Sequence, residues 1–146
     1  MLWRLEPLNW PNVERIIVRD ADSRPSLREA LAVSEWIREN TILHIMRDHP
    51  YHRPKIMGGM FGLRQDPLIR NINWEYEADE FYRNSGEDAD DQFFLEKALY
   101  YRCKNSRTVH DEIHRYEPEA RDYPLSWPAN GSFIGEYVCP ESPLRS

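Results

Sequence analysis

The stretch of sequence that decides the fold is ERIIVRDADSR, at residues 14–24. Its β-branched residues predict a buried strand at residues 13–19, and the strand stops at Asp20 and Asp22. In extended backbone, side chains at positions i and i+2 point to the same side, so the two carboxylates are expected to converge on one ligand. Carboxylate oxygens suit Mg²⁺ or Mn²⁺, which share them with substrate phosphates.

Two arginines, Arg19 and Arg24, flank this carboxylate pair. They can neutralise the pair or reach a phosphate. The Asp-x-Asp spacing is weak evidence when it stands alone, because acidic residues scattered along a chain produce it by chance. Two solvated acids in a turn after a strand are therefore the alternative interpretation.

Length and composition limit the classes of function. A chain of 146 residues with 40% hydrophobic residues predicts a single globular domain. Its net charge of −6 argues against nucleic acid or an anionic membrane surface as the main partner. Two cysteines do not make a disulfide framework, and the sequence shows no signal peptide or apolar run of membrane-spanning length. We expect a soluble, cytoplasmic protein.

Helical and extended segments alternate along the chain. Ser26 and Glu29 form a capping box that opens a helix at residues 26–40, and a strand is expected at residues 41–46. Further helices are expected at residues 66–83 and 91–102, with a late strand at 131–138. This alternation predicts an α/β fold, a mixed sheet flanked by helices.

Three histidines surround an Arg-Asp pair in HIMRDHPYH, at residues 44–52. His44, His49 and His52 could bind zinc together with Asp48, and such a site would support hydrolysis. We expect no zinc site here, because the cluster crosses a strand-to-loop boundary that scatters side chains. A plain polar loop, or a substrate-binding loop that uses Arg47, Asp48 and His49, remains open.

Three other features carry both a structural and a functional interpretation. Gly58 and Gly59 predict a kinked strand or bulge, or a place where backbone approaches a sugar or phosphate. A predicted helix starts at Asp90, Asp91 and Gln92, where acids are favoured by capping and the helix dipole. Asp91 or Asp90 can also serve there as a base or hydroxyl acceptor. His110 is either plain structure or a nitrogen ligand for the metal at Asp22.

Several blocks resemble a family of uncharacterised glycosyltransferase-like proteins with a His-Ile-Met-Arg-Asp-His-Pro signature. The blocks are RDADSR, AVSEWI, HIMRDHPYHRPKIMGGMFGLR, DDQFFL and VHDE, and the resemblance spans about residues 1–136. The broader likeness is to nucleotide-sugar-dependent transferases of the GT-A type, especially glycogenin-like retaining enzymes. It implies metal-dependent glycosyl transfer from a nucleotide sugar to an acceptor, which the sequence does not identify.

The resemblance also implies roles for single residues. Asp20 resembles the acid near the ribose and the metal, Asp22 the principal ligand of Mn²⁺ or Mg²⁺, and His110 the third metal ligand. Gly58 and Gly59 lie where such enzymes place a strand beside the donor and acceptor sugars. The pair formed by Asp91 and Gln92 resembles the Asp-Gln pair that contacts the donor sugar and carries catalysis.

One departure from the family concerns length. GT-A domains have a nucleotide-binding βαβ half ahead of the Asp-x-Asp, whereas only 19 residues precede Asp20. The expectation is a partial GT-A-like domain with an open sheet edge, which dimerises or needs a partner chain for the other half. The alternatives are an inactive truncated paralogue or interaction module, and a metal-dependent hydrolase built on the histidines.

Overall fold

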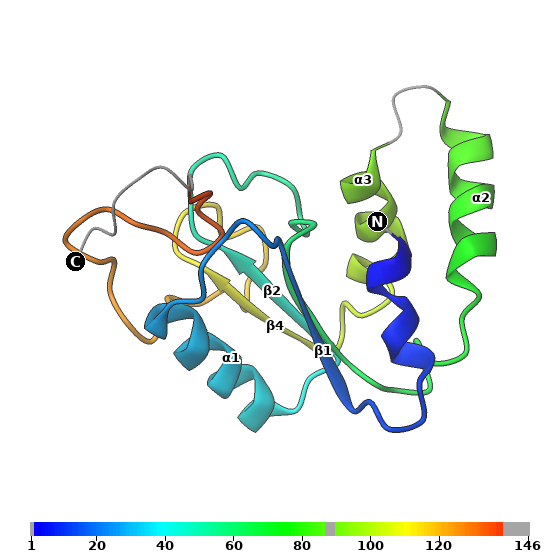
Figure 1. The fold of residues 1–146 in the computed structure, drawn as a ribbon, viewed down its shortest axis with the longest axis horizontal. Helices are drawn as coiled ribbons and strands as arrows, with labels where there is room; N and C mark the ends of the chain where they lie inside the picture. The colour runs from blue at the N-terminus through cyan, green and yellow to red at the C-terminus, as the bar shows by residue number, and fades with distance from the viewer. Residues whose placement is uncertain (1, 87–89, 139–146) are drawn as a thin grey trace.

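A four-stranded mixed sheet forms the centre of the molecule (Figure 1). The computed structural model describes residues 2–86 and 90–138. The strands are β1 (Arg15–Arg19), β2 (Leu43–Arg47), β3 (Met60–Arg64) and β4 (Arg107–Asp111), in the order β1-β3-β2-β4. The mixed α/β class predicted from the sequence is confirmed.

Strand directions bring three strand ends to one edge of the sheet. β3 pairs antiparallel with both β1 and β2, and β4 pairs parallel with β2. β1, β2 and β4 therefore point the same way, and the residues that follow them emerge on the same side. Among the described residues, β1 is an edge strand paired only with β3, whereas the outer side of β4 is bridged to Arg121.

Helix α1 (Leu27–Glu39) covers one face of the sheet. Ser26 caps it by accepting a hydrogen bond from the Glu29 amide at 3.2 Å, and Asn40 ends it in the left-handed conformation at φ 57°. Trp36 packs so closely on Gly62 of β3 that a methyl group there would lie 2.8 Å from the indole ring. The Ser26 cap and both helix ends predicted from the sequence are confirmed. The Glu29 side chain pairs with Arg19.

The other face carries the larger hydrophobic core. It is covered by two short helices near the N-terminus, η1 (Leu2–Arg4) and η2 (Glu6–Asn9), and by α2 (Trp74–Ser85) and α3 (Asp91–Leu95). A π-helical turn, η3 (Glu96–Tyr100), continues α3. The sheet thus lies between two helical layers (Figure 1).

Two predicted elements differ from the structure. The helix expected at 66–83 begins only at Trp74, because Asn71 adopts a left-handed φ of 62° that a helix does not tolerate. No strand forms at 131–138, since Gly131 and Gly135 have φ values of 74° and 83°; that segment makes a single bridge, from Tyr137 to Ser23. β4 was not predicted as a strand.

Within the described residues, no helix combines the length and the apolar character needed to cross a membrane.

Candidate functional site

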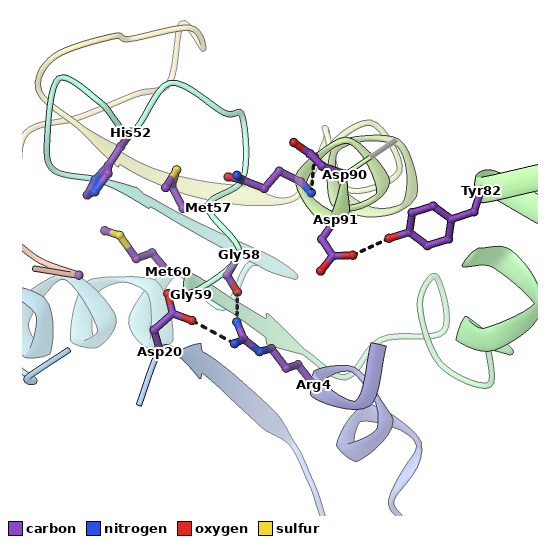
Figure 2. Close-up of a pocket in the computed structure, with 12 residues that line it drawn as sticks. Arg4, Asp20, His52, Met57, Gly58, Gly59, Met60, Tyr82, Asp90 and Asp91 are labelled. Carbon is purple, nitrogen blue, oxygen red and sulfur yellow. Dashed lines mark hydrogen bonds and ion pairs between the residues drawn. The ribbon is translucent and has the colours of Figure 1, made fainter. Parts of the chain in front are cut away.

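An open pocket of about 800 Å³ lies between the C-terminal end of β1, the loop before β3 and the start of α3 (Figure 2). Its walls come from segments far apart in the sequence. They are Arg4, Asp20, His52, Met57, Gly58, Gly59, Met60, Tyr82, Asp90, Asp91, Gln92 and Gly135. A cavity of this size matches the range of small-molecule sites.

One side of the pocket is built around Arg4. Its Nη1 donates a hydrogen bond to the carbonyl oxygen of Gly58 at 2.8 Å, and its Nη2 lies 3.0 Å from Asp20 Oδ1. Figure 2 shows the Arg4 guanidinium reaching from η1 to both partners. Residue 59 must be glycine in this arrangement, because a side-chain Cβ would overlap the Asp20 carboxylate.

The opposite side is the start of α3. Asp90 caps the helix by accepting hydrogen bonds from the amides of Gln92 at 2.8 Å and Phe93 at 2.9 Å. Tyr82 of α2 donates its hydroxyl to Asp91 Oδ1. Burial and this bond raise the pKa of Tyr82 to about 12, which keeps the hydroxyl protonated. Gln92 Oε1 is buried and has no hydrogen-bond donor among the described residues.

The pocket gathers five of the residues predicted to form the site. Asp20 follows β1, Gly58 and Gly59 precede β3, and Asp91 and Gln92 begin α3, yet all five line this one cavity. The sequence prediction did not include Arg4, His52, Tyr82 and the two methionines. Arg4 stands in no motif, and only its place in the fold brings it to Asp20.

His110 lies elsewhere. It belongs to β4, the edge strand opposite β1, three strand spacings or roughly 14 Å away. Its ring is buried, with Nδ1 2.9 Å from His44 Nε2 and Nε2 3.0 Å from Glu35 Oε2. The prediction that His110 shares a cation with Asp20 and Asp22 is therefore wrong.

Asp22 and its neighbours also lie outside the pocket. The chain turns after β1, with the Ser23 amide bonded to the Asp20 carbonyl at 3.3 Å, so the extended backbone that would align Asp20 with Asp22 is absent there. The Asp22 carbonyl accepts a hydrogen bond from Val138. Arg19 pairs with Glu29, and Arg24 is exposed beyond the pocket lining.

The predicted substrate loop is mainly structural. Arg47 is fully buried, where its Nε binds Asp111 at 2.7 Å and its Nη2 binds Glu117. Asp48 is fully buried as well and binds the guanidinium of Arg28. Neither lines the pocket, which corrects their assignment to substrate binding.

The histidine cluster is divided between two places. His44 stacks on Trp36 beneath α1, with ring centroids 5.3 Å apart. His49 and His52 belong to the loop after β2, and of the two only His52 lines the pocket. His49 instead contacts Phe133, at 4.2 Å between ring centroids. Burial first, and then the charge of His49, lower the pKa of His52 to about 4, so His52 is neutral near pH 7.

Across residues 2–86 and 90–138, no three His, Cys, Asp or Glu side chains are grouped so that they could hold a metal ion. The ligand set predicted for Mn²⁺ or Mg²⁺ therefore does not fit this arrangement. Asp20 forms an ion pair with Arg4.

Comparison with models of protein families, with curated proteins and with solved structures finds no match to this chain.

Gly59, which lines the pocket, allows a test that separates the geometry of the site from the stability of the fold. In Gly59→Ala the new methyl group displaces the Asp20 carboxylate, which is half-exposed and free to rotate away. We expect little change in the melting temperature but loss of the Arg4–Asp20 contact, visible as shifted Arg4 side-chain NMR signals. In Gly62→Ala the methyl group meets the fixed Trp36 ring, so the free energy of unfolding is expected to fall by about 1–3 kcal/mol. Equal destabilisation of both variants would contradict this description of the pocket.

Proposed function

We propose that the pocket binds the activated sugar of a glycosyl-transfer reaction, with a nucleotide sugar as donor, in the cytoplasm. The observation that supports this is the meeting of three sequence segments in one cavity. Asp20, the glycines at 58–59 and the pair at 91–92 are the positions that resemble the donor site of GT-A transferases, and they line the same pocket. A partial GT-A-like fold is part of the same proposal.

The chemistry of the walls suits a sugar. Hydroxyl groups donate hydrogen bonds to carboxylates and amide oxygens. The pocket offers Asp20, Asp91 and the Oε1 of Gln92, which has no donor among the described residues. Met57, which is partly exposed, supplies apolar surface for the C–H face of a pyranose. Such a mixture of apolar walls and a few placed polar groups is typical of small-molecule sites.

The proposal assigns binding and positioning roles to the residues of this chain. Gln92 accepts from a sugar hydroxyl, and Asp91, which accepts a hydrogen bond from Tyr82, is the base or hydroxyl acceptor. A divalent cation such as Mn²⁺ or Mg²⁺ stays a prediction of the resemblance. No step is assigned to it here, because its predicted ligands Asp22 and His110 lie outside the pocket.

The test is titration with a panel of hexoses linked to uridine or guanosine diphosphate, followed calorimetrically. Loss of one hydrogen bond corresponds to roughly 3- to 10-fold in affinity, so Gln92→Ala is expected to weaken binding by about that factor. Asp79→Asn, in an exposed carboxylate of α2 outside the pocket, is the control and should bind like the wild type. Absence of binding by any nucleotide sugar, or equal loss in both variants, would refute the proposal.

Transfer itself is measured as release of nucleoside diphosphate, with water taking the glycosyl group in place of the unidentified acceptor. Asp91→Asn keeps the shape of the side chain and removes its basicity, so release is expected to fall at least 10-fold while binding persists. Binding of nucleotide sugars without any release in the wild type would favour the alternative of a non-catalytic sugar-binding module.

A further inference from the structure

Arg4 is the permanent cation among the residues that line the pocket. The other basic lining residue is His52, which is neutral near pH 7 because burial lowers its pKa to about 4. The remaining charges of the lining are the carboxylates of Asp20, Asp90 and Asp91. Among the lining residues, Arg4 is therefore the countercharge for an anionic part of a ligand.

The position of Arg4 is built by the fold. Its side chain is 22% exposed, and its two contacts bridge the end of β1, at Asp20, and the loop before β3, at Gly58. A guanidinium has five N–H donors in a planar fork that matches phosphate oxygens. The contacts to Asp20 and Gly58 leave further donors for a ligand.

Each of the three carboxylates nearby already has a hydrogen-bond or ion-pair partner. Asp90 directs its Oδ1 to the amides of α3, and Asp91 accepts from Tyr82. Asp20 faces the guanidinium and keeps it in place. Gly58 carries no side chain beside the guanidinium. The space beside Gly59 is taken by the Asp20 carboxylate, which is half-exposed.

We propose that Arg4 is the phosphate-binding residue of this pocket and supplies the positive charge that the resemblance assigns to a divalent metal. The inference rests on the proposed function for the identity of the ligand, the diphosphate of an activated sugar. It names a site residue that belongs to none of the sequence motifs. Phosphate binding by this chain then needs no added metal ion.

The experiment uses inorganic pyrophosphate as the probe, in buffer with EDTA, with binding followed by isothermal titration calorimetry. Wild-type protein is expected to bind, and Arg4→Gln to bind about 10- to 100-fold more weakly, the range for loss of a charge-assisted hydrogen-bonding group. Arg70→Gln removes the same charge from an exposed position outside the pocket and is the matched control. Equal weakening in both variants would overturn the proposal.

The Asp20→Asn variant distinguishes phosphate binding by Arg4 from phosphate binding by a metal ion. If Arg4 binds the phosphate, removal of the neighbouring negative charge leaves pyrophosphate affinity in EDTA unchanged or raises it, because repulsion of the ligand falls. If Asp20 holds a metal, pyrophosphate binds only after Mn²⁺ is added, and Asp20→Asn abolishes that binding. The second result would overturn the proposal.

A further variant guards against a folding defect in Arg4→Gln. Arg4→Lys keeps the charge but not the planar fork, so its pyrophosphate affinity is expected to lie between those of the wild type and Arg4→Gln. An Arg4→Lys protein with an unchanged melting temperature that binds no better than Arg4→Gln would contradict a role for charge.

Failure of this inference can be distinguished from failure of the proposed function. Metal-free pyrophosphate binding that depends on Arg4, in a protein that neither binds nor turns over nucleotide sugars, supports Arg4 and refutes the sugar-transfer proposal. Nucleotide-sugar binding that depends on Gln92 but persists in Arg4→Gln refutes the Arg4 inference and leaves the proposed function standing.

Discussion

Asp48→Ala is expected to lower the free energy of unfolding by about 3–5 kcal/mol, the range for breaking a buried ion pair by removing one partner. The side chains of Asp48 and Arg28 are 1% and 2% exposed, and their closest atoms are 2.7 Å apart. Without Asp48, the guanidinium of Arg28 stays buried beside Tyr123 and loses its principal countercharge.

The carboxylate of Asp48 also binds the C-terminal segment around residues 127–134. It accepts hydrogen bonds from Trp127 Nε1 at 2.9 Å and from the Ile134 amide at 3.0 Å. Both donors belong to the irregular chain that follows β4, so Asp48→Ala is expected to loosen this segment as well. Because domains are stable by about 5–15 kcal/mol in total, the loss is a large fraction of the whole.

Chemical denaturation followed by tryptophan fluorescence measures this effect. Asp122→Ala is the control, since Asp122 pairs with Arg115 at the surface, with side chains 68% and 49% exposed, and such pairs contribute at most about 1 kcal/mol. If Asp48→Ala and Asp122→Ala cost the same, the buried network does not hold the segment as described.

Local sequence signals predicted the part of the fold that local interactions determine. The Ser26 cap, the apolar face of α1 and the stop at Asn40 are short-range features, and the structure contains all three. The strands β1 and β2 likewise follow from β-branched and apolar runs. The Ser26 cap was predictable because it depends on backbone groups within one turn of the helix.

Elements that depend on distant partners were not predictable in the same way. β4 has the sequence RTVHD, which shows only a brief β-branched signal, and becomes a strand because it pairs with β2 in parallel register. Its polar residues are satisfied by side chains from elsewhere: Asp111 binds Arg47, and His110 binds His44. A search for sequence patterns finds only a mixture of polar and apolar residues in this segment. The hydrogen-bonding partners that make it a strand come from β2.

The site residues also differ in how well the sequence predicted them. The resemblance placed Asp20 together with the residues at 58–59 and 91–92 in one site, and they do line one pocket. The failures are Asp22, whose alignment with Asp20 needed extended backbone, and His110, whose ring is fixed at the opposite edge of the sheet. Arg4 could not be found, because nothing near it in sequence shows that η1 lies beside the end of β1.

A large dependence of stability on pH is expected from three buried histidines. Burial lowers the pKa of His44 well below its ordinary value and, followed by the charge of His49, lowers the pKa of His52 to about 4. Burial also lowers the pKa of His110, although the hydrogen bond to Glu35 opposes that shift. Each of these three histidine residues has at most 8% of its surface exposed to solvent.

Hydrogen bonding explains why His44 and His110 stay neutral. The contacts are satisfied when His110 donates from Nε2 to Glu35 and His44 donates from Nε2 to His110 Nδ1. His44 Nδ1 is buried without a hydrogen-bond partner among the described residues. A proton added there would be an unsatisfied buried charge, which is costly.

The sign of the effect follows from proton binding. As the pH falls below about 6.5, the unfolded chain takes up protons on these histidines, whereas folded His52 does so only near pH 4. The unfolded state therefore binds more protons in this window, and the free energy of unfolding falls as the pH is lowered. At 1.36 kcal/mol per unit, each histidine that stays neutral in the folded state costs about 2 kcal/mol between pH 6.5 and 5.

Urea denaturation at pH 7, 6 and 5 measures this loss, and stopping at pH 5 largely excludes the carboxylates, whose ordinary pKa values lie near 4. His52→Asn has no titrating group but keeps an oxygen that can accept from the Asp48 amide, as Nδ1 of His52 does at 3.0 Å. We expect this variant to lose about 2 kcal/mol less than the wild type over that range, whatever its stability at pH 7. The same loss in both proteins would mean that His52 is protonated as easily in the folded state as in the unfolded chain, and the neutral, buried His52 described for the pocket wall would be wrong.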